Sequence, residues 1–223
     1  MFRRFFASVL LASLAGISFA ADRYQMDIII FSRVTPKALS SEYWRSSPSW
    51  LEKSQPITLA PSEEKADNPN YPTLTLLPEE DMALKKEASR LEKLKDVVIL
   101  NRSSWQMTRE QLNHPIHITL NGGDFISPSM FQNDLTNTPN LTLSGNLEIR
   151  LKRYFNTRFR LILSEPASGV KAYLHEARNC GDDDVCRFYF ERTRRTRSKE
   201  LNYIDTPLLG VVFTITPVAQ PVE

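Results

Sequence analysis

The residues best suited to bind a charged ligand are arginines in the C-terminal half of the chain. Residues 145–200 hold 13 Lys and Arg against 8 Asp and Glu, a local net charge of +5. Guanidinium groups bind carboxylates through two parallel N–H donors, so this segment suits a polymer that carries carboxylates. A soluble sheet face rich in arginine is an equally good interpretation. The candidate contacts are Arg150, Lys152, Arg158, Arg160, Arg194, Arg195 and Arg197, with Tyr203 as a surface for a sugar ring.

Residues with the spacing of an enzyme active site are absent from the sequence. The three histidines, His114, His117 and His175, show no HExxH or similar ligand spacing. No GxSxG, Walker or GxGxxG motif occurs, and we predict neither a metal ion nor a cofactor. Folding can still bring two carboxylates together, so Glu200 and Asp205 are the candidates for a carboxylate-dependent hydrolase.

Two cysteines, Cys180 and Cys186, are predicted to form one disulfide, because both lie in a part of the chain expected to reach an oxidising compartment. The loop between them contains three consecutive aspartates, at positions 182–184. Consecutive carboxylates point in different directions, so a solvated turn is favoured over a metal site.

The first twenty residues have the pattern of a signal peptide. Arg3 and Arg4 precede an apolar stretch that ends in Ser18-Phe19-Ala20, which favours cleavage after Ala20; an uncleaved anchor is the alternative. We therefore expect an exported protein without an integral membrane segment after cleavage. Residues 21–223 then carry 26 Lys and Arg against 26 Asp and Glu, and this zero net charge argues against a nucleic-acid partner.

Strands are expected to position the arginines. Alternating or continuous apolar runs predict strands over residues 24–31, 97–100, 116–120, 143–151, 159–163 and 209–216. Residues 170–178 and 187–193 are predicted to pair as a hairpin with the disulfide near its tip. A turn near Asn156 and Thr157 would align Arg150 and Lys152 with Arg158 and Arg160, so that like charges would face each other across two strands.

One amphipathic helix is predicted after residue 78, with a buried stripe formed by Leu84, Ala88, Leu91, Leu94 and Val98. Residues 46–78 contain six prolines and predict a long irregular connection. A short helix near Glu42 precedes it. These elements predict an α+β fold with a mainly antiparallel β-sheet, one clear amphipathic helix and the Pro-rich connection.

Three segments resemble the CsiV family of periplasmic peptidoglycan-binding proteins. They are YQMDIIIFSR at residues 24–33, LSGNLEIRLKRYFNTRFRLIL at residues 143–163 and RRTRSKELNYIDTPLLGVVFTITP at residues 194–217. The second segment has the family's Leu-x-Gly and a strand that ends in Arg-Tyr. The third has its pair of arginines, its Ser-x-Glu-Leu and a glycine near the start of the last strand.

The resemblance implies a non-enzymatic protein of the Gram-negative periplasm, with a signal peptide at residues 1–20 and a single domain at residues 21–223. Such a protein would bind peptidoglycan and act with the lipoprotein activator of a class A penicillin-binding protein, supporting cell-wall synthesis and cell shape. Without the resemblance, the residues leave two alternatives open: an exported cell-wall hydrolase that uses Glu200 and Asp205, and a protein–protein adaptor without affinity for glycan.

Overall fold

The side chains of strand β1 (Arg23–Ser32) point alternately into two separate hydrophobic clusters. In the computed structural model, which describes residues 22–33, 35–44, 59–60, 74–123 and 142–219, both faces of this strand are buried. Tyr24, Met26, Ile28 and Ile30 contribute to the main core, as the alternating pattern predicts. The opposite face carries Ile29 and Phe31, which belong to a second, smaller cluster that the sequence did not indicate.

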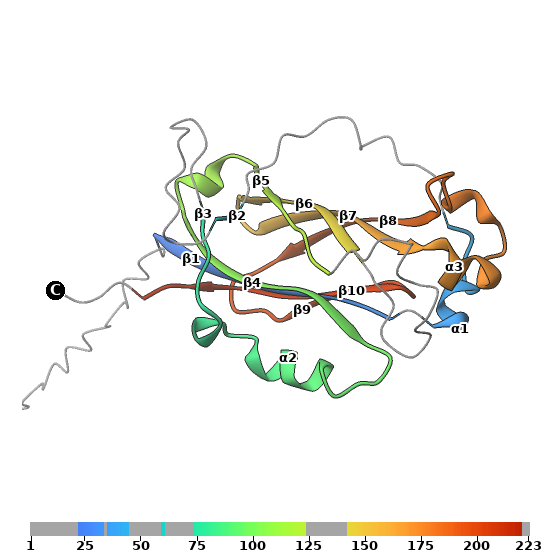
Figure 1. Cartoon of the computed structure of the whole chain (residues 1–223). Helices are drawn as coiled ribbons and strands as arrows, with labels where there is room; N and C mark the ends of the chain where they lie inside the picture. The colour runs from blue at the N-terminus through green and yellow to red at the C-terminus, as the bar shows by residue number, and fades with distance from the viewer. Residues whose placement is uncertain (1–21, 34, 45–58, 61–73, 124–141, 220–223) are drawn as a thin grey trace, which may run out of the picture.

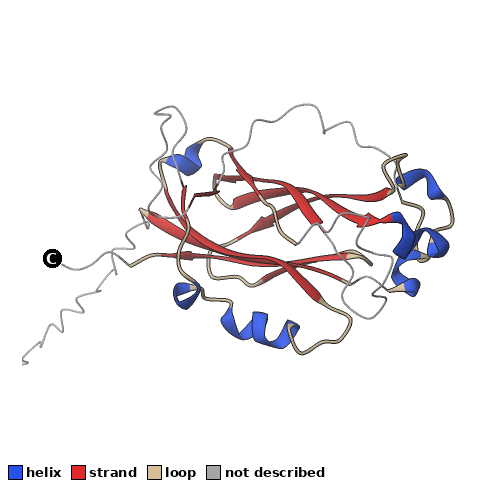
Figure 2. Cartoon of the chain, viewed as in Figure 1, coloured by secondary structure: helices blue, strands red, loops and turns tan. Residues whose placement is uncertain are grey.

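Two four-stranded sheets pack face to face around the main core (Figures 1 and 2). Rings from the two layers meet there: the centroids of Phe159 and Phe213 lie 5.3 Å apart, and those of Tyr24 and Phe155 lie 5.0 Å apart. All strand pairs within these two sheets are antiparallel, so the predicted α+β fold with a mainly antiparallel sheet is confirmed. The first sheet has the order β4 (Val98–Thr108), β1, β10 (Leu209–Pro217) and β9 (Asn202–Asp205); the second has β5 (Ile116–Thr119), β6 (Thr142–Leu151), β7 (Phe155–Pro166) and β8 (Val185–Thr196).

The amphipathic helix is shorter than predicted. A 3-10 turn, η1 (Glu79–Asp81), precedes α2 (Lys85–Leu91), which covers the smaller cluster on the outer face of the first sheet. The segment between them is held by β1, because the N–H of Ala83 donates to Asp27 over 2.9 Å. Ala88 is buried as expected, but Leu94 is 53% exposed and Val98 already belongs to β4. Tertiary hydrogen bonds therefore override the helical periodicity at both ends.

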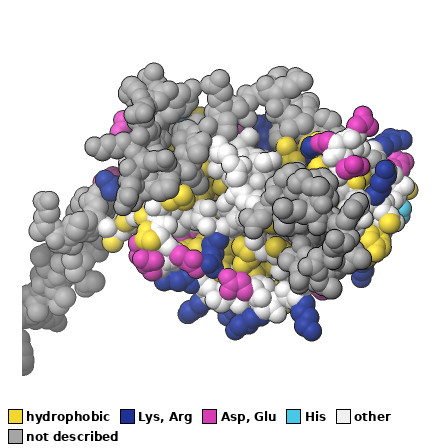
Figure 3. Space-filling view, viewed as in Figure 1, with side chains coloured by type: hydrophobic (Ala, Val, Ile, Leu, Met, Phe, Trp, Pro, Cys, Tyr) yellow, Lys and Arg dark blue, Asp and Glu magenta, His cyan; other side chains and the backbone are white. Residues whose placement is uncertain are grey.

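Basic and acidic side chains gather together over η1 and α2 at the lower edge of the molecule in the view of Figure 3. Arg102 illustrates the mixture, since its guanidinium group forms ion pairs with both Glu79 and Glu92. Arg102 is therefore neutralised by acids, and the mixture of both signs of charge makes this surface a solvated charged face and a poor candidate for an anion site.

The predicted hairpin of residues 170–178 with residues 187–193 is wrong. The first half forms short helical turns, and β8 pairs along its whole length with β7. Strand β7 offers a twelve-residue edge whose inner face is mostly apolar, and Phe188 and Phe190 of β8 are buried in the core beside it. The turns that replace the predicted strand are α3 (Ala167–Val170), η4 (Lys171–Tyr173) and η5 (Ala177–Asn179).

The remaining elements are short. The helix expected near Glu42 is α1 (Pro36–Leu39), which ends before that residue, and η2 (Gln111–Asn113) links β4 to β5. The Pro-rich connection contains a two-residue parallel pair, β2 (Leu59–Ala60) with β3 (Leu74–Thr75), so it is not wholly irregular. Most of that connection (residues 46–58 and 61–73), the predicted signal peptide and the loop at residues 124–141 lie outside the described residues.

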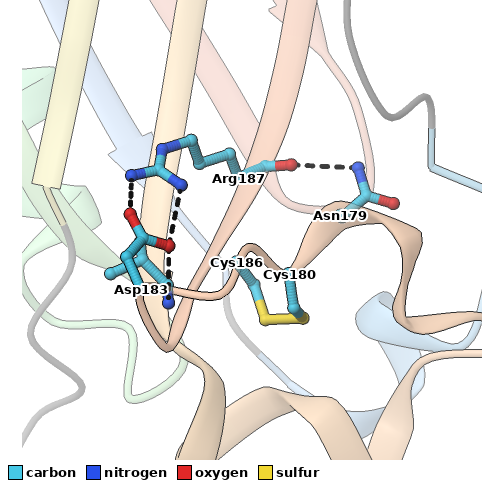
Figure 4. Close-up of a disulfide and its surroundings, with 6 residues drawn as sticks. Asn179, Cys180, Asp183, Cys186 and Arg187 are labelled. Atoms are coloured by element: carbon cyan, nitrogen blue, oxygen red, sulfur yellow. Dashed lines mark hydrogen bonds and ion pairs between the residues drawn. A yellow bond between two sulfur atoms is a disulfide. The ribbon is translucent and has the colours of Figure 1, made fainter.

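The predicted disulfide between Cys180 and Cys186 is present, and it closes the loop that precedes β8 (Figure 4). Within the loop, the carboxylate of Asp183 forms an ion pair with Arg187, which lowers the pKa of that carboxyl group. The side-chain amide of Asn179 donates to the backbone carbonyl of Arg187 over 2.9 Å. The aspartates therefore belong to a salt-bridged turn, and the described residues contain no group of three or more potential metal ligands.

Reducing this disulfide is expected to destabilise the protein by roughly 2 kcal/mol, because the closed loop limits the entropy of the unfolded chain. Urea unfolding with and without a dithiol measures the difference, and the Cys180→Ala, Cys186→Ala double variant provides a reagent-free comparison. Equal unfolding free energies in the oxidised and reduced proteins would contradict this expectation.

Gly145, the glycine of the Leu-x-Gly motif, has a structural role in β6. Its φ is +146°, and an added Cβ would lie 2.2 Å from the carbonyl oxygen of Arg160 on β7. Gly145→Ala should therefore cost roughly 3 kcal/mol of unfolding free energy, from backbone strain and from the clash. Gly169→Ala is the matched control, since no atom lies within 4 Å of its added Cβ. Similar unfolding midpoints for the two variants would refute this role.

Candidate functional site

The outer face of the second sheet carries polar residues because β7 alternates strictly. Its even-numbered positions point outward, while Phe155, Thr157 and Phe159 are buried inside. The turn that starts β7 lies at residues 152–154, three residues earlier than predicted, and is closed by the N–H of Lys152 donating to the carbonyl of Tyr154 over 3.0 Å. This shift sets the register of every arginine on the face.

The predicted ladder of like charges does not form in this register. Arg158 lies opposite Glu148 and contacts its carboxylate at 3.5 Å. Arg160 lies opposite Glu191 and donates to it over 3.1 Å. Both arginines are thus neutralised by acids on the neighbouring strands, as cross-strand pairing favours.

The last row of outward-facing residues, next to the β6–β7 turn, carries positive charge without an acid. Arg150, Asn156 and Arg195 face one another across β6, β7 and β8, and the row contains no acid. Lys152 and Arg153 follow in the adjoining turn and are exposed. Positive charge therefore accumulates at this end of the sheet, whereas the two preceding rows are internally neutral.

Tyr154 lies at the centre of this positive end. The guanidinium carbon of Arg195 lies 3.7 Å from the centroid of its ring, and those of Arg153 and Arg197 each lie 5.6 Å away. The negative face of an aromatic ring attracts guanidinium groups, and this attraction offsets part of the repulsion between three neighbouring cations. Hydrogen bonds from Arg197 and then Arg195 lower the pKa of the Tyr154 phenol, and the same bond raises the pKa of Arg197.

We call this group the Tyr154 cluster. Within the described part of the chain, no carboxylate lies within 4 Å of any of its cationic groups. Its residues are Arg150, Lys152, Arg153, Tyr154, Arg195 and Arg197.

The eight residues predicted as contacts do not all gather at one place. Four of them, Arg150, Lys152, Arg195 and Arg197, belong to the Tyr154 cluster. Arg158 and Arg160 share the face but have acidic partners.

Two predicted contacts lie elsewhere. Arg194 is on the opposite face of β8 from Arg195, and its Nε approaches Asn202 of β9 at 3.4 Å. Tyr203 lies on the outer face of the first sheet, where its ring stacks on Phe31 with centroids 6.4 Å apart and its hydroxyl accepts from Arg33. Neither residue faces the Tyr154 cluster, so a single surface does not include all eight.

A tryptophan ring can also stack on a sugar, but Trp105 is fully buried and Trp44 packs edge-on against Phe188. Trp50 lies outside the described residues. Sequence reasoning missed Arg153 and Tyr154 as site residues, although both stand in the Arg-Tyr pair that ends the first strand of the 143–163 motif.

The carboxylates proposed for a hydrolase have separate structural partners. Glu200 accepts from the backbone N–H of Arg197 over 3.0 Å and from the hydroxyl of Thr196 over 3.1 Å, and these bonds lower its pKa. Asp205 forms an ion pair with Arg33 on the outer face of the first sheet. Glu200 thus supports the β8–β9 turn and Asp205 the end of β9, and neither arrangement resembles an acid–base pair.

Comparison with known families gives one result. The family model described as "Peptidoglycan-binding protein, CsiV" matches residues 4–218, nearly the whole chain. No curated protein matches the chain, and neither does any solved structure. No helix among the described residues is both long and apolar enough to cross a membrane.

Proposed function

The chain belongs to the CsiV family of peptidoglycan-binding proteins, and from this premise we propose that it is a non-enzymatic periplasmic protein that binds peptidoglycan. In this proposal residues 1–20 are a cleaved signal peptide, and residues 21–223 are the mature protein, a single domain. The disulfide between Cys180 and Cys186 is consistent with export to an oxidising compartment.

The Tyr154 cluster is the observation that carries the proposal. Three guanidinium groups, those of Arg153, Arg195 and Arg197, lie around one tyrosine at the end of the second sheet, and Arg150 and Lys152 add charge beside them. Glu200 acts electrostatically on Arg197, but no described carboxylate lies within ion-pair distance of these cations. Like charges at such distances repel unless an anion or solvent ions screen them. Peptidoglycan supplies anions in a fixed array, because its stem peptides carry free carboxylates.

Association with the lipoprotein activator of a class A penicillin-binding protein, and through it a role in wall synthesis and cell shape, is part of the same proposal. It rests on the likeness of residues 143–163 and 194–217 to the motifs of the family. Crosslinking in intact cells should capture the activator. A strain that lacks the protein should show altered cell shape. A normal shape, together with no crosslinked activator, would contradict the proposed association and the role in cell shape.

A pelleting assay with purified sacculi tests peptidoglycan binding. The mature protein, from Ala21 onward, should sediment with sacculi, and less of it should sediment as the salt concentration rises. The supernatant should contain no released muropeptides. Release would favour a hydrolase, and an absence of both sedimentation and release would favour an adaptor without affinity for the wall.

A further inference from the structure

We propose that the Tyr154 cluster recognises the free carboxylates of the stem peptides and not the sugar rings of the glycan strand. This inference rests on the proposed function and names the chemical group that the site would bind. Three features of the cluster lead to it: the ring that is covered by arginines, the N–H edges of those arginines, and the acidic partners that the other arginines of the same face already have.

The tyrosine ring is not an open platform for a sugar. With the guanidinium carbon of Arg195 at 3.7 Å from the ring centroid, that group lies in van der Waals contact with the aromatic face. Arg153 and Arg197 approach within 5.6 Å of the same centroid. A sugar ring needs an exposed aromatic face to stack on, and these arginines occupy the space around the ring of Tyr154.

The same stacking prepares the arginines for a carboxylate. A guanidinium group that stacks through its flat face keeps its N–H donors at the edges, where a carboxylate binds in the plane through two parallel hydrogen bonds. Tyr154 thus holds Arg195 in place and lowers the entropy that the arginine would lose on binding.

The remaining arginines of the face show what the cluster lacks. Arg158 and Arg160 each contact a carboxylate of a neighbouring strand, at 3.5 Å and 3.1 Å. In the adjacent row, the residue opposite Arg150 and Arg195 is Asn156, which is neutral. The Nε of Arg150 is buried and has no hydrogen-bond partner among the described residues. The row is therefore complementary to an anion that the chain itself does not supply there.

Competition with soluble fragments separates the two parts of the wall polymer. The mature protein is bound to sacculi and challenged with a stem tetrapeptide, with the same peptide after amidation of its carboxylates, and with peptide-free glycan strands. We expect the free tetrapeptide to displace the protein at a concentration at least tenfold lower than the amidated peptide, and the glycan strands not to compete. Equal competition by the amidated peptide or by the glycan strands would overturn the inference while peptidoglycan binding stands.

A charge-conserving variant tests the paired hydrogen bonds apart from the general positive field. Arg195→Lys with Arg197→Lys keeps the net charge but loses the planar fork and its stacking, so the tetrapeptide should compete at least fivefold less effectively. Unchanged competition, in a variant with a wild-type unfolding midpoint, would show that charge alone suffices and overturn the inference. If the wild-type protein does not sediment with sacculi at all, the proposed function fails and the inference fails with it.

Discussion

Replacing Arg195 and Arg197 by glutamine is expected to weaken sedimentation with sacculi at least tenfold. Hydrogen bonds to charged groups contribute about 1.5–3 kcal/mol each, and about 1.4 kcal/mol corresponds to a factor of ten in affinity. Both side chains are exposed, so the variant should fold normally, with an unfolding free energy within about 0.5 kcal/mol of wild type. Sedimentation over a range of sacculus concentrations measures the loss.

The matched control is Lys171→Gln with Arg178→Gln, which removes the same charge at the opposite end of β7. Both residues are exposed and lie in the turns that follow that strand. If this control weakens sedimentation as much as the Arg195 and Arg197 variant does, then net charge governs binding and the Tyr154 cluster has no special role. The slope of binding against salt should also fall only in the cluster variant.

Removing the ionisable group of Glu165 is expected to produce the largest change in stability. This residue ends the inner face of β7, directly opposite Cys186, and is 1% exposed. Neither of its carboxylate oxygens has a hydrogen-bond partner in the part of the chain that is described. Burial away from water raises the pKa of the carboxyl group from 4.5 to about 8.

The sign of the effect follows from proton binding. The carboxyl group of Glu165 binds its proton more tightly in the folded protein than in the unfolded chain. Its contribution to the unfolding free energy is therefore most favourable below pH 4.5 and is lost as the pH rises to about 8. A shift of this size corresponds to a loss on the order of 5 kcal/mol across that window. Other groups titrate as well, so the difference between wild type and variant is the quantity to measure.

Glu165→Gln should therefore flatten the dependence of unfolding free energy on pH between about 5 and 8, and Glu165→Leu should in addition remove the unpaired polar group. Urea unfolding at several pH values measures both. Glu191→Gln, an exposed carboxylate on β8, is the control and should keep the wild-type slope. The prediction would be wrong if the unfolding free energy of Glu165→Gln decreased with pH as steeply as that of the wild type.

Much of the fold could be predicted, because strands leave a local signature. The alternation in β6 and the start of β7 assigned the buried face correctly, and that of β1 identified the face toward the main core but not its second buried face. The apolar run of β10 was predicted as a strand, and the structure shows both of its faces buried. What failed was the pairing. Strand β8 does not pair with residues 170–178, as predicted, but with the long edge of β7. Hydrophobic periodicity does not reveal which strand is the partner.

The site was predicted in part for the same reason. Local charge identified the arginine-rich segment, but the three-residue error in the β6–β7 turn put Arg158 and Arg160 opposite the wrong residues. In the correct register these two meet acids, and the cations without acidic partners gather around Tyr154. A tyrosine next to an arginine carries no signal of that arrangement, since the ring is covered by residues about forty positions later in the chain.

The most direct test of the central claim is a map of the arginines that peptidoglycan protects. The mature protein is treated with phenylglyoxal, an arginine-selective reagent, with and without soluble peptidoglycan fragments, and the modified positions are identified by mass spectrometry. Binding through the Tyr154 cluster predicts protection of Arg153, Arg195 and Arg197, and unchanged modification of Arg178 and Arg192. Protection confined to other arginines, or none at fragment concentrations that block sedimentation with sacculi, would contradict it.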